Sequence, residues 1–254
     1  MDANKPLSVE GVWKGYRRGS EWVEVLDNVS FDVEPGEIVA ITGSKLAGKT
    51  TLLKMAAGME RPNKGTVSLG SRQLTDGRGG LLGHTIRWVD DEGPKLKLDV
   101  VKFVGLPLAL HGSKRGEAER MAAQALERVG AKSCLGRRWG ELSNWQRVLV
   151  GLARGFAGNP QVVVIDDLLD VRGGRATEEA ADLLRSLVEA SESRCGVLMS
   201  VSDMESAMFA DRVWSITGKR SLKLMAGRQT SGKVIPLREG DRASAGGSRG
   251  VGSA

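Results

Sequence analysis

The chain has 254 residues, of which 41% are hydrophobic and 27% charged, and its formal net charge at pH 7 is +6. This length buries a substantial core, and no stretch approaches the roughly 20 apolar residues of a membrane-spanning helix. Cys134 and Cys195 lack metal-ligand spacing, which argues against a zinc site or a disulfide framework. The polar N-terminus shows no apolar signal segment, so we expect a cytoplasmic protein.

The positive charge is concentrated near the C-terminus. Residues 218–254 hold eight basic and two acidic side chains, a difference of +6 that equals the excess of the whole chain. Residues 238–254 are rich in Gly, Ser and Ala and have few large apolar side chains, so we expect a disordered basic tail. A solvated tail explains this charge better than a lipid or nucleic-acid contact, and we expect no nucleic-acid partner.

Strand patterns open the chain. Val9 to Tyr16 and Trp22 to Val33 read as antiparallel strands that lead into the core. The apolar run from Glu37 to Thr42 then predicts a buried strand, followed at once by glycine and by a helix that begins near Lys49. The order is therefore strand, glycine-containing loop and helix.

Helical patterns dominate the middle of the chain. After a strand candidate from His84 to Val89, the spacing of apolar residues predicts helices over Leu98 to Leu110, Gly116 to Val129 and Ser143 to Phe156. We expect these helices to form an inserted helical subdomain over residues 90–159.

Strands and helices alternate again in the last third. The apolar run Val162 to Ile165 predicts a buried strand that ends at two aspartates. A helix around Ala180 to Val188 is followed by three predicted strands: Gly196 to Val201, Val213 to Thr217 and Ser221 to Met225. Such alternation predicts a mainly parallel α/β sheet flanked by helices, formed by residues 1–89 and 160–237, with the N-terminal strands as an antiparallel β subdomain.

The loop after the strand that ends at Thr42 has the sequence GSKLAGKT, which fits the phosphate-loop pattern. Backbone N–H groups of such a loop surround phosphate oxygens at a helix N-terminus, and the strand before it and the helix after it argue against chance. Lys49 is predicted to reach the β- and γ-phosphates and Thr50 to ligate Mg²⁺. The predicted ATP-binding residues of this P-loop NTPase core are Gly43, Ser44, Lys45, Leu46, Ala47, Gly48, Lys49, Thr50 and Thr51.

Asp166 supplies a carboxylate at the end of the buried strand Val162 to Ile165. A carboxylate at that place holds magnesium opposite a phosphate loop, directly or through water. The alternative is an ordinary helix-capping or turn aspartate. The two motifs in this order predict a P-loop NTPase that binds Mg-ATP.

The sequence LSNWQR, residues 142–147, precedes this strand at the place where ABC ATPases carry their LSGGQ signature, and the chain resembles that family over residues 6 to 225. Tyr16 stands where the family has an adenine-stacking aromatic, although it could instead pack on the sheet. VLDNVSFDVEPGEIVAITG and the stretch Leu98 to Leu110 resemble the group that exports macrolides or releases lipoproteins with a separate permease subunit. The resemblance implies an ATP-driven dimer.

Several positions depart from the family pattern. Asp167 stands where the family has the catalytic glutamate and is one methylene shorter, which makes it a weakened base. Ser202 falls at the switch histidine and carries no positive charge. The glutamine-loop position falls on Asp91, or on Asp90 or Glu92 if the alignment shifts by one residue, and a carboxylate there would repel the γ-phosphate.

The signature positions are Ser143, Asn144, Trp145 and Gln146. Ser143 is expected both to cap its helix and to contact a γ-phosphate across a dimer interface. Asn144 and Trp145 replace two glycines and add side chains against phosphate, with Trp145 a candidate for packing at the dimer interface. The resemblance implies composite sites, each formed by the phosphate loop of one subunit and the signature of the other. A homodimer would therefore have two poor sites. A heterodimer would pair this chain's signature with a partner's phosphate site, and this chain's phosphate site with the partner's signature.

The sequence therefore predicts the ATP-binding subunit of an ABC transporter with slow hydrolysis. It would lie at the inner face of the cell membrane, with a permease docked beside Asp90 to Leu110. The main alternative is an ATP-gated regulatory module that acts on a membrane partner without turnover. An ABC protein acting on DNA or ribosomes would show two cassettes or a coiled coil, and a nucleotide kinase would not explain LSNWQR.

Overall fold

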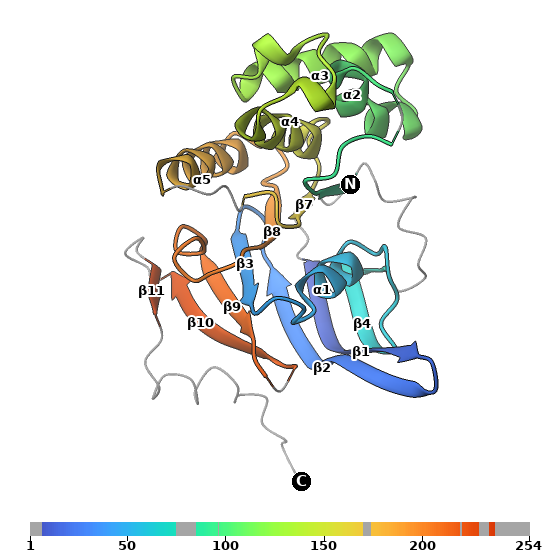
Figure 1. Cartoon of the computed structure of the whole chain (residues 1–254), viewed down its shortest axis with the longest axis vertical. Coiled ribbons are helices and arrows are strands. Elements are labelled where there is room, and N and C mark those ends of the chain that lie inside the picture. The colour runs from blue at the N-terminus through green and yellow to red at the C-terminus, as the bar shows by residue number, and fades with distance from the viewer. Residues whose placement is uncertain are drawn as a thin grey trace.

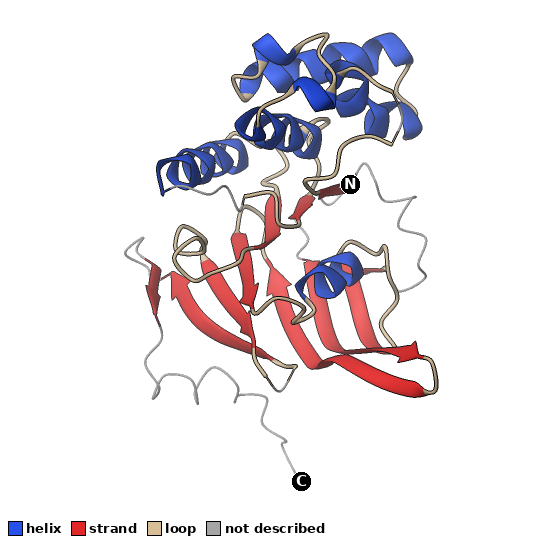
Figure 2. Cartoon of the chain, viewed as in Figure 1, coloured by secondary structure: helices blue, strands red, loops and turns tan. Residues whose placement is uncertain are grey.

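The computed structural model describes residues 7–74, 85–95, 97–169, 174–218, 220–228 and 234–236. In this part of the chain, strands gather at one end and most helices at the other (Figures 1 and 2). None of the described helices combines the length and the hydrophobicity needed to cross a bilayer. His84 and residues 238–254, for which the sequence predicts a strand start and a tail, lie outside the described residues.

The smaller sheet is antiparallel, with strand order β2-β1-β4-β5. Its long hairpin confirms the two strands predicted at the start of the chain, with Val29, Phe31 and Val33 buried in alternation. The two shorter strands were not predicted. The four strands are β1 (Leu7–Arg18), β2 (Glu21–Val33), β4 (Lys64–Leu69) and β5 (Arg72–Gln73).

The larger sheet has strand order β11-β10-β9-β3-β8-β7-β6, in which β9, β3, β8, β7 and β6 run parallel and the other two pair antiparallel. Its strands are β3 (Ile38–Gly43), β6 (Ile86–Val89), β7 (Val162–Ile165), β8 (Gly196–Ser200), β9 (Arg212–Ile216), β10 (Leu222–Arg228) and β11 (Val234–Pro236). The predicted mainly parallel α/β fold with an antiparallel subdomain is confirmed.

Five α-helices and two short 3₁₀ turns complete the described structure. Three of these helices and both turns lie between β6 and β7 in sequence and pack together at one end of the molecule (Figure 1). The helices are α1 (Lys49–Ala56), α2 (Val100–Leu110), α3 (Arg115–Arg128), α4 (Asn144–Phe156) and α5 (Gly174–Glu189), and the turns are η2 (Lys132–Cys134) and η3 (Trp139–Glu141).

Two predicted elements have bounds that differ from the structure by two residues. Helix α2 begins at Val100 rather than at Leu98, because Asp99 is its N-cap and its side chain accepts a hydrogen bond from the backbone N–H of Lys102 at 2.9 Å. Strand β1 extends two residues beyond the predicted Val9 to Tyr16 at each end.

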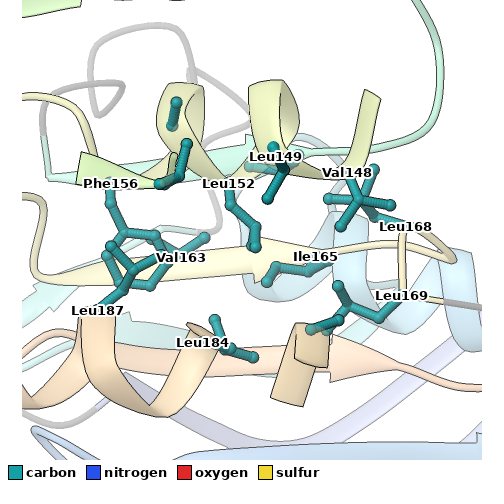
Figure 3. Close-up of a cluster of buried hydrophobic side chains, with 14 of the residues drawn as sticks. Val148, Leu149, Leu152, Phe156, Val163, Ile165, Leu168, Leu169, Leu184 and Leu187 are labelled. Atoms are coloured by element: carbon teal, nitrogen blue, oxygen red, sulfur yellow. The ribbon is translucent and has the colours of Figure 1, made fainter. Parts of the chain in front are cut away.

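The larger sheet separates two hydrophobic cores. One face packs against α1 and the antiparallel sheet, and the other face packs against α2 to α5. Figure 3 shows the second core where α4, β7 and α5 meet, with Leu152 of α4 and Leu184 of α5 on either side of Val163 and Ile165. Because both faces are covered, β7 and β8 consist almost entirely of buried side chains.

A buried ion pair ties α5 to the centre of the sheet. Asp211 is 6% exposed and accepts two hydrogen bonds from the Arg185 guanidinium, at 2.9 and 3.1 Å. The same carboxylate accepts the backbone N–H of Ile38 at 2.8 Å, at the start of β3. Loss of this carboxylate would leave the guanidinium without its ionic partner and the strand N–H without its acceptor.

We therefore expect Asp211→Ala to lower the free energy of unfolding by about 3 kcal/mol, the usual loss when one partner of a buried pair is removed. Urea denaturation followed by circular dichroism measures the loss. Glu119→Ala is the control, because it breaks the exposed Arg115–Glu119 pair and should change the free energy by less than about 0.5 kcal/mol. Equal effects of the two substitutions would contradict a central role for Asp211.

Candidate functional site

The loop from Gly43 to Gly48 connects the end of β3 to the start of α1, and it lies at the carboxyl edge of the parallel strands. Gly43 and Gly48 have φ angles of 153° and 101°, which favour glycine. A Cβ at Gly48 would lie 2.7 Å from Val25 Cγ1, so the loop can pack against β2 only without a side chain there. Helix α1 has no side-chain cap among the described residues, which leaves its first N–H groups available for an anion.

Lys49 spans the loop from the first turn of α1. Its Nζ donates a hydrogen bond to the Gly43 carbonyl at 2.9 Å, so the ammonium is held on the inner side of the loop. The ring of backbone amides together with this ammonium has the geometry and charge to bind phosphate groups.

An open cavity of about 700 Å³ runs from this loop along the edge of the antiparallel sheet. Its volume lies in the range of small-molecule sites. Its walls combine residues 44–51 of the predicted phosphate loop with side chains from β1, β2, the segment after β7 and the turn after β9: Tyr16, Arg18, Glu24, Asp167 and Arg220 are among them. The cavity therefore places an aromatic ring, cations and a phosphate-type loop around one space.

Tyr16 is anchored at the edge of this cavity with 36% of its surface exposed. Its hydroxyl donates to Glu60 at 2.6 Å, and Glu60 in turn pairs with Lys14 at 2.9 Å. Burial, followed by the hydrogen bond to Glu60, raises the pKa of Tyr16 to about 12, so the ring stays neutral at physiological pH. Lys14 Nζ lies 5.1 Å from the ring centroid, which is a cation–π contact.

Asp166 and Thr50 meet beside the loop. Asp166 follows β7 directly and is 8% exposed, and its carboxylate accepts a hydrogen bond from the Thr50 hydroxyl at the start of α1. Burial raises the pKa of Asp166 above its usual value, while the hydrogen bonds from Ser200 and Thr50 oppose that rise. A carboxylate and a hydroxyl in contact are the oxygen ligands that Mg²⁺ takes together with phosphates.

Asp167 is exposed, lines the cavity and has a left-handed backbone with φ of 51°. Its backbone N–H donates to Ser200 Oγ, and its Oδ1 accepts from the same hydroxyl, both at 2.9 Å. The structure thus places Tyr16, the phosphate loop, Thr50 and Asp167 around one cavity, and Asp166 lies behind Thr50, to which it is hydrogen-bonded.

The predicted signature residues do not line this cavity. Ser143 caps α4, and its side chain accepts the N–H of Gln146 at 3.2 Å. Gln146 Oε1 accepts in return from the Ser143 N–H at 3.0 Å and from Arg137 Nη1 at 3.1 Å. Asn144 is exposed, whereas Trp145 is half-buried and packs against the core of its own chain.

The remaining predicted catalytic positions also lie outside the phosphate cavity. Asp91 and Ser202 are exposed. Asp90 is engaged by its neighbours, because its carboxylate accepts from Trp88 Nε1 at 2.7 Å and from the Glu92 N–H at 3.2 Å.

A second cavity, of about 280 Å³, lies between the end of β6 and α2. Its walls include the apolar side chains of Trp88, Leu98, Phe103 and Leu106. Arg154 crosses this cavity from α4, with its guanidinium 4.7 Å from the Phe103 ring centroid and Nη1 donating to the Trp88 carbonyl at 3.3 Å. This groove combines these apolar side chains with the charged residues Asp90, Glu92, Lys95 and Arg154, and it lies where the sequence predicts a permease to dock.

The sequence reasoning missed Arg220, which lines the phosphate cavity, and also Ser200 and Glu60, which bond to residues that line it. Ser200 carries a signal, because it is a polar residue inside the otherwise apolar run Gly196 to Val201. Glu60 and Arg220 carry no such signal, since their places at the site depend on contacts between segments distant in sequence.

Comparison with known proteins adds independent evidence. The profile of a family described as "ABC transporter" matches residues 26–169. The chain is 32% identical over 214 residues to the lipoprotein-releasing system ATP-binding protein LolD of Chromohalobacter salexigens, covering 82% of this chain and 89% of that protein. It is also 29% identical over 212 residues to the macrolide export ATP-binding/permease protein MacB of Chlorobium luteolum, covering 82% of this chain and 31% of that protein.

The fold is similar to that of a solved ATP-binding cassette, MJ0796, in a dimeric post-hydrolysis state bound to ADP and Pi. The TM-score is 0.76 at 21% sequence identity, and the match covers 91% of this chain and 99% of the other. The similarity establishes the arrangement of the two sheets and the helices as that of this cassette.

If Tyr16 stacks on a nucleobase, Tyr16→Ala should weaken binding of a fluorescent ATP analogue roughly 5- to 150-fold, the range expected for one aromatic stack. Tyr16→Phe keeps the ring and loses only the hydroxyl contacts to Glu60 and Thr51, so its dissociation constant should stay near that of the unmodified chain. Titration by fluorescence anisotropy measures both. Equal losses for the two variants would show that the hydroxyl network, and not the ring, supports binding.

Proposed function

Because the chain belongs to the ABC transporter family, as an ATP-binding subunit that energises a membrane partner, we propose that it binds Mg-ATP in the cavity at the end of β3 and hydrolyses it slowly. The observation that carries this proposal is the convergence of the phosphate loop, Tyr16 and Thr50 on one cavity, with Asp166 hydrogen-bonded to Thr50. The loop matches the phosphates of Mg-ATP, Tyr16 matches the adenine, and Thr50 with Asp166 matches the magnesium ion.

The phosphates would be held by the loop amides and by Lys49. The loop has glycine where side chains would collide, and the N-terminus of α1 adds the positive end of a helix dipole. Lys49 would exchange its hydrogen bond to the Gly43 carbonyl for phosphate oxygens. The adenine would stack on Tyr16 on the ring face away from Lys14.

Magnesium fits the oxygen ligands that the chain offers. Thr50 and Asp166 present a hydroxyl and a carboxylate already in contact, and Mg²⁺ commonly binds through one or two carboxylates plus phosphates. Bound there, the ion would neutralise phosphate charge, while the burial of Asp166 would keep its carboxylate fixed in place.

Hydrolysis would be slow because the groups that act on water and on the γ-phosphate are altered. Asp167 lines the cavity but has a shorter side chain than glutamate, and Ser202 offers no cation. At the signature, the Gln146 amide is bonded within its own chain and Trp145 packs inward. The γ-phosphate contact from a partner subunit would therefore rest on Ser143 and the α4 N-terminus.

The membrane partner would be a permease that docks in the groove between β6 and α2. The groove is lined by residues from the end of β6 and from helices α2 and α4. A permease segment bound there would therefore move when these helices rotate relative to the nucleotide core. Relatives named for lipoprotein release and for macrolide export suggest a permease of that group. We propose a dimer, of two copies or with a second cassette, at the inner face of the cell membrane.

A regulatory module that binds ATP without turnover is the alternative. The same altered positions favour it, because binding depends on the phosphate loop and Tyr16 whereas turnover depends on Asp167, Ser202 and the signature. Turnover by the purified chain, alone and with a second cassette, separates the two functions.

Lys49→Ala should weaken binding of Mg-ATP at least about 10-fold, since one charge-assisted contact to phosphate is worth roughly 1.5–3 kcal/mol. Nucleotide anisotropy and phosphate release in the same preparations measure binding and turnover. Lys114→Ala serves as the control, because it removes an exposed lysine that does not line the cavity. Unchanged binding in Lys49→Ala would overturn the proposed site.

If the short Asp167 side chain limits hydrolysis, Asp167→Glu should raise kcat, by up to about a hundredfold if its reach is the only defect. Its effect on KM should be small, because Asp167 is not among the groups proposed to hold phosphate. Asp167→Asn provides the opposite control and should lower kcat further. A Glu variant no faster than the unmodified chain would show that Ser202 or the signature sets the rate.

A further inference from the structure

Ser200 is a fully buried hydroxyl at the last position of β8. In the sheet register it pairs with Ile41 of β3, while the preceding Met199 pairs with Ile165 of β7. This register brings Ser200 level with Asp166, the first residue after β7, and just below the phosphate loop. Buried hydroxyls in a strand core require hydrogen-bond partners, and this one finds them in the two site aspartates.

Three contacts converge on the Ser200 hydroxyl. Its Oγ lies 2.8 Å from Asp166 Oδ1 and 2.9 Å from Asp167 Oδ1, and it accepts the Asp167 N–H at 2.9 Å. A hydroxyl has one hydrogen, so it donates to one carboxylate at a time. The two like-charged carboxylates are thus held on either side of a single donor.

We propose that Ser200 is the positioning residue of this site: its hydroxyl orients Asp166 as a magnesium ligand and holds Asp167 at the edge of the cavity. The inference rests on the proposed Mg-ATP site and extends it to a residue outside the recognised motifs. Because the Ser200 hydroxyl bonds Asp166 through Oδ1, that carboxylate keeps a second oxygen for a cation, while the Asp167 N–H donates to the same Ser200 oxygen.

The backbone contact adds a second constraint. Asp167 has a left-handed φ of 51°, a conformation that costs energy for residues other than glycine and is best tolerated by Asp and Asn. The Asp167 N–H bond to Ser200 Oγ holds this conformation, and the side-chain bond to the same atom closes a small ring. Without the hydroxyl, the Asp167 side chain would be free to swing into solvent, because it is already exposed.

Ser200→Val and Ser200→Thr form a matched pair, since Val and Thr have nearly the same shape and differ in the hydroxyl. The fluorescent ATP analogue is titrated first with EDTA and then with increasing Mg²⁺. We expect Ser200→Val to bind the analogue in EDTA within about twofold of the unmodified chain. Its apparent affinity for Mg²⁺ should fall about 10-fold, the lower end for loss of an outer-shell partner, and Ser200→Thr should restore it.

The results that would overturn the inference are distinct. An equal loss of binding in EDTA and in Mg²⁺, or equal behaviour of the Val and Thr variants, would show that Ser200 has only a packing role. If the unmodified chain itself bound no nucleotide, or bound it without any effect of Mg²⁺, the proposed function would fail, and the inference with it. Nucleotide binding with a normal Mg²⁺ response in Ser200→Val would overturn the positioning role alone.

A second measurement uses no nucleotide, and it still tests the inference if Ser200→Val folds poorly. Ser200→Ala and Asp167→Ala are made singly and together, and their urea midpoints are compared. If the hydroxyl holds Asp167, the shift of the double variant should be smaller than the sum of the single shifts. Strict additivity would contradict a contact between the two residues.

Discussion

The site depends on the parallel pairing of β3 with β8 and of β8 with β7. Parallel strands present their carboxyl ends at one edge of a sheet, and here that edge carries the phosphate loop after β3, Ser200 at the end of β8 and Asp166 after β7. These groups therefore lie close together without a long connecting loop. At the opposite end of β3, Asp211 forms a bidentate ion pair with Arg185 and also accepts the N–H of Ile38. These bonds fix the start of β3 and therefore help to fix the position of the loop at its end.

Two residues of this site, Leu46 and Asp167, have a left-handed backbone conformation. Leu46 adopts φ of 68° with its side chain 94% exposed, a conformation and an exposure that leucine disfavours. Asp167 adopts a similar φ, but a short acidic side chain tolerates it and finds a hydrogen bond to Ser200. A short acidic side chain at position 167 therefore suits this backbone.

The sequence was informative wherever pattern and function coincide in a short stretch. The phosphate loop from Gly43 to Thr50 follows an apolar strand and opens a helix, and the structure places it so. Strand β4 escaped prediction because KGTVSL holds two apolar residues among polar ones and forms only by pairing with the distant β1. Such long-range pairing leaves little trace in a local pattern.

The same limit applies to side-chain networks in the site. The partner of the Tyr16 hydroxyl is Glu60, 44 residues away, and nothing in either neighbourhood points to the other. The inward packing of Trp145 likewise depends on the folded helices and has no local signal in the sequence. The sequence showed only that Trp145 stands where the family has glycine. Motif spacing predicts which groups meet the nucleotide, while the second layer that orients them has to be seen in three dimensions.

In the proposed dimer, the two halves of the site offer a nucleotide different groups, and this bears on the partner. The nucleotide half brings the phosphate loop, Tyr16 and Thr50 around one cavity, with Asp166 bonded to Thr50, whereas Gln146 in the signature half is bonded to Arg137 and to Ser143 at the start of α4. In a homodimer, every nucleotide would face Asn144 and Trp145 in place of the family's two glycines. A partner cassette with an intact signature would complete the cavity of this chain, and Ser143 and α4 would then face the partner's nucleotide. We therefore propose that a second cassette with that signature would complete the site better than a second copy of this chain.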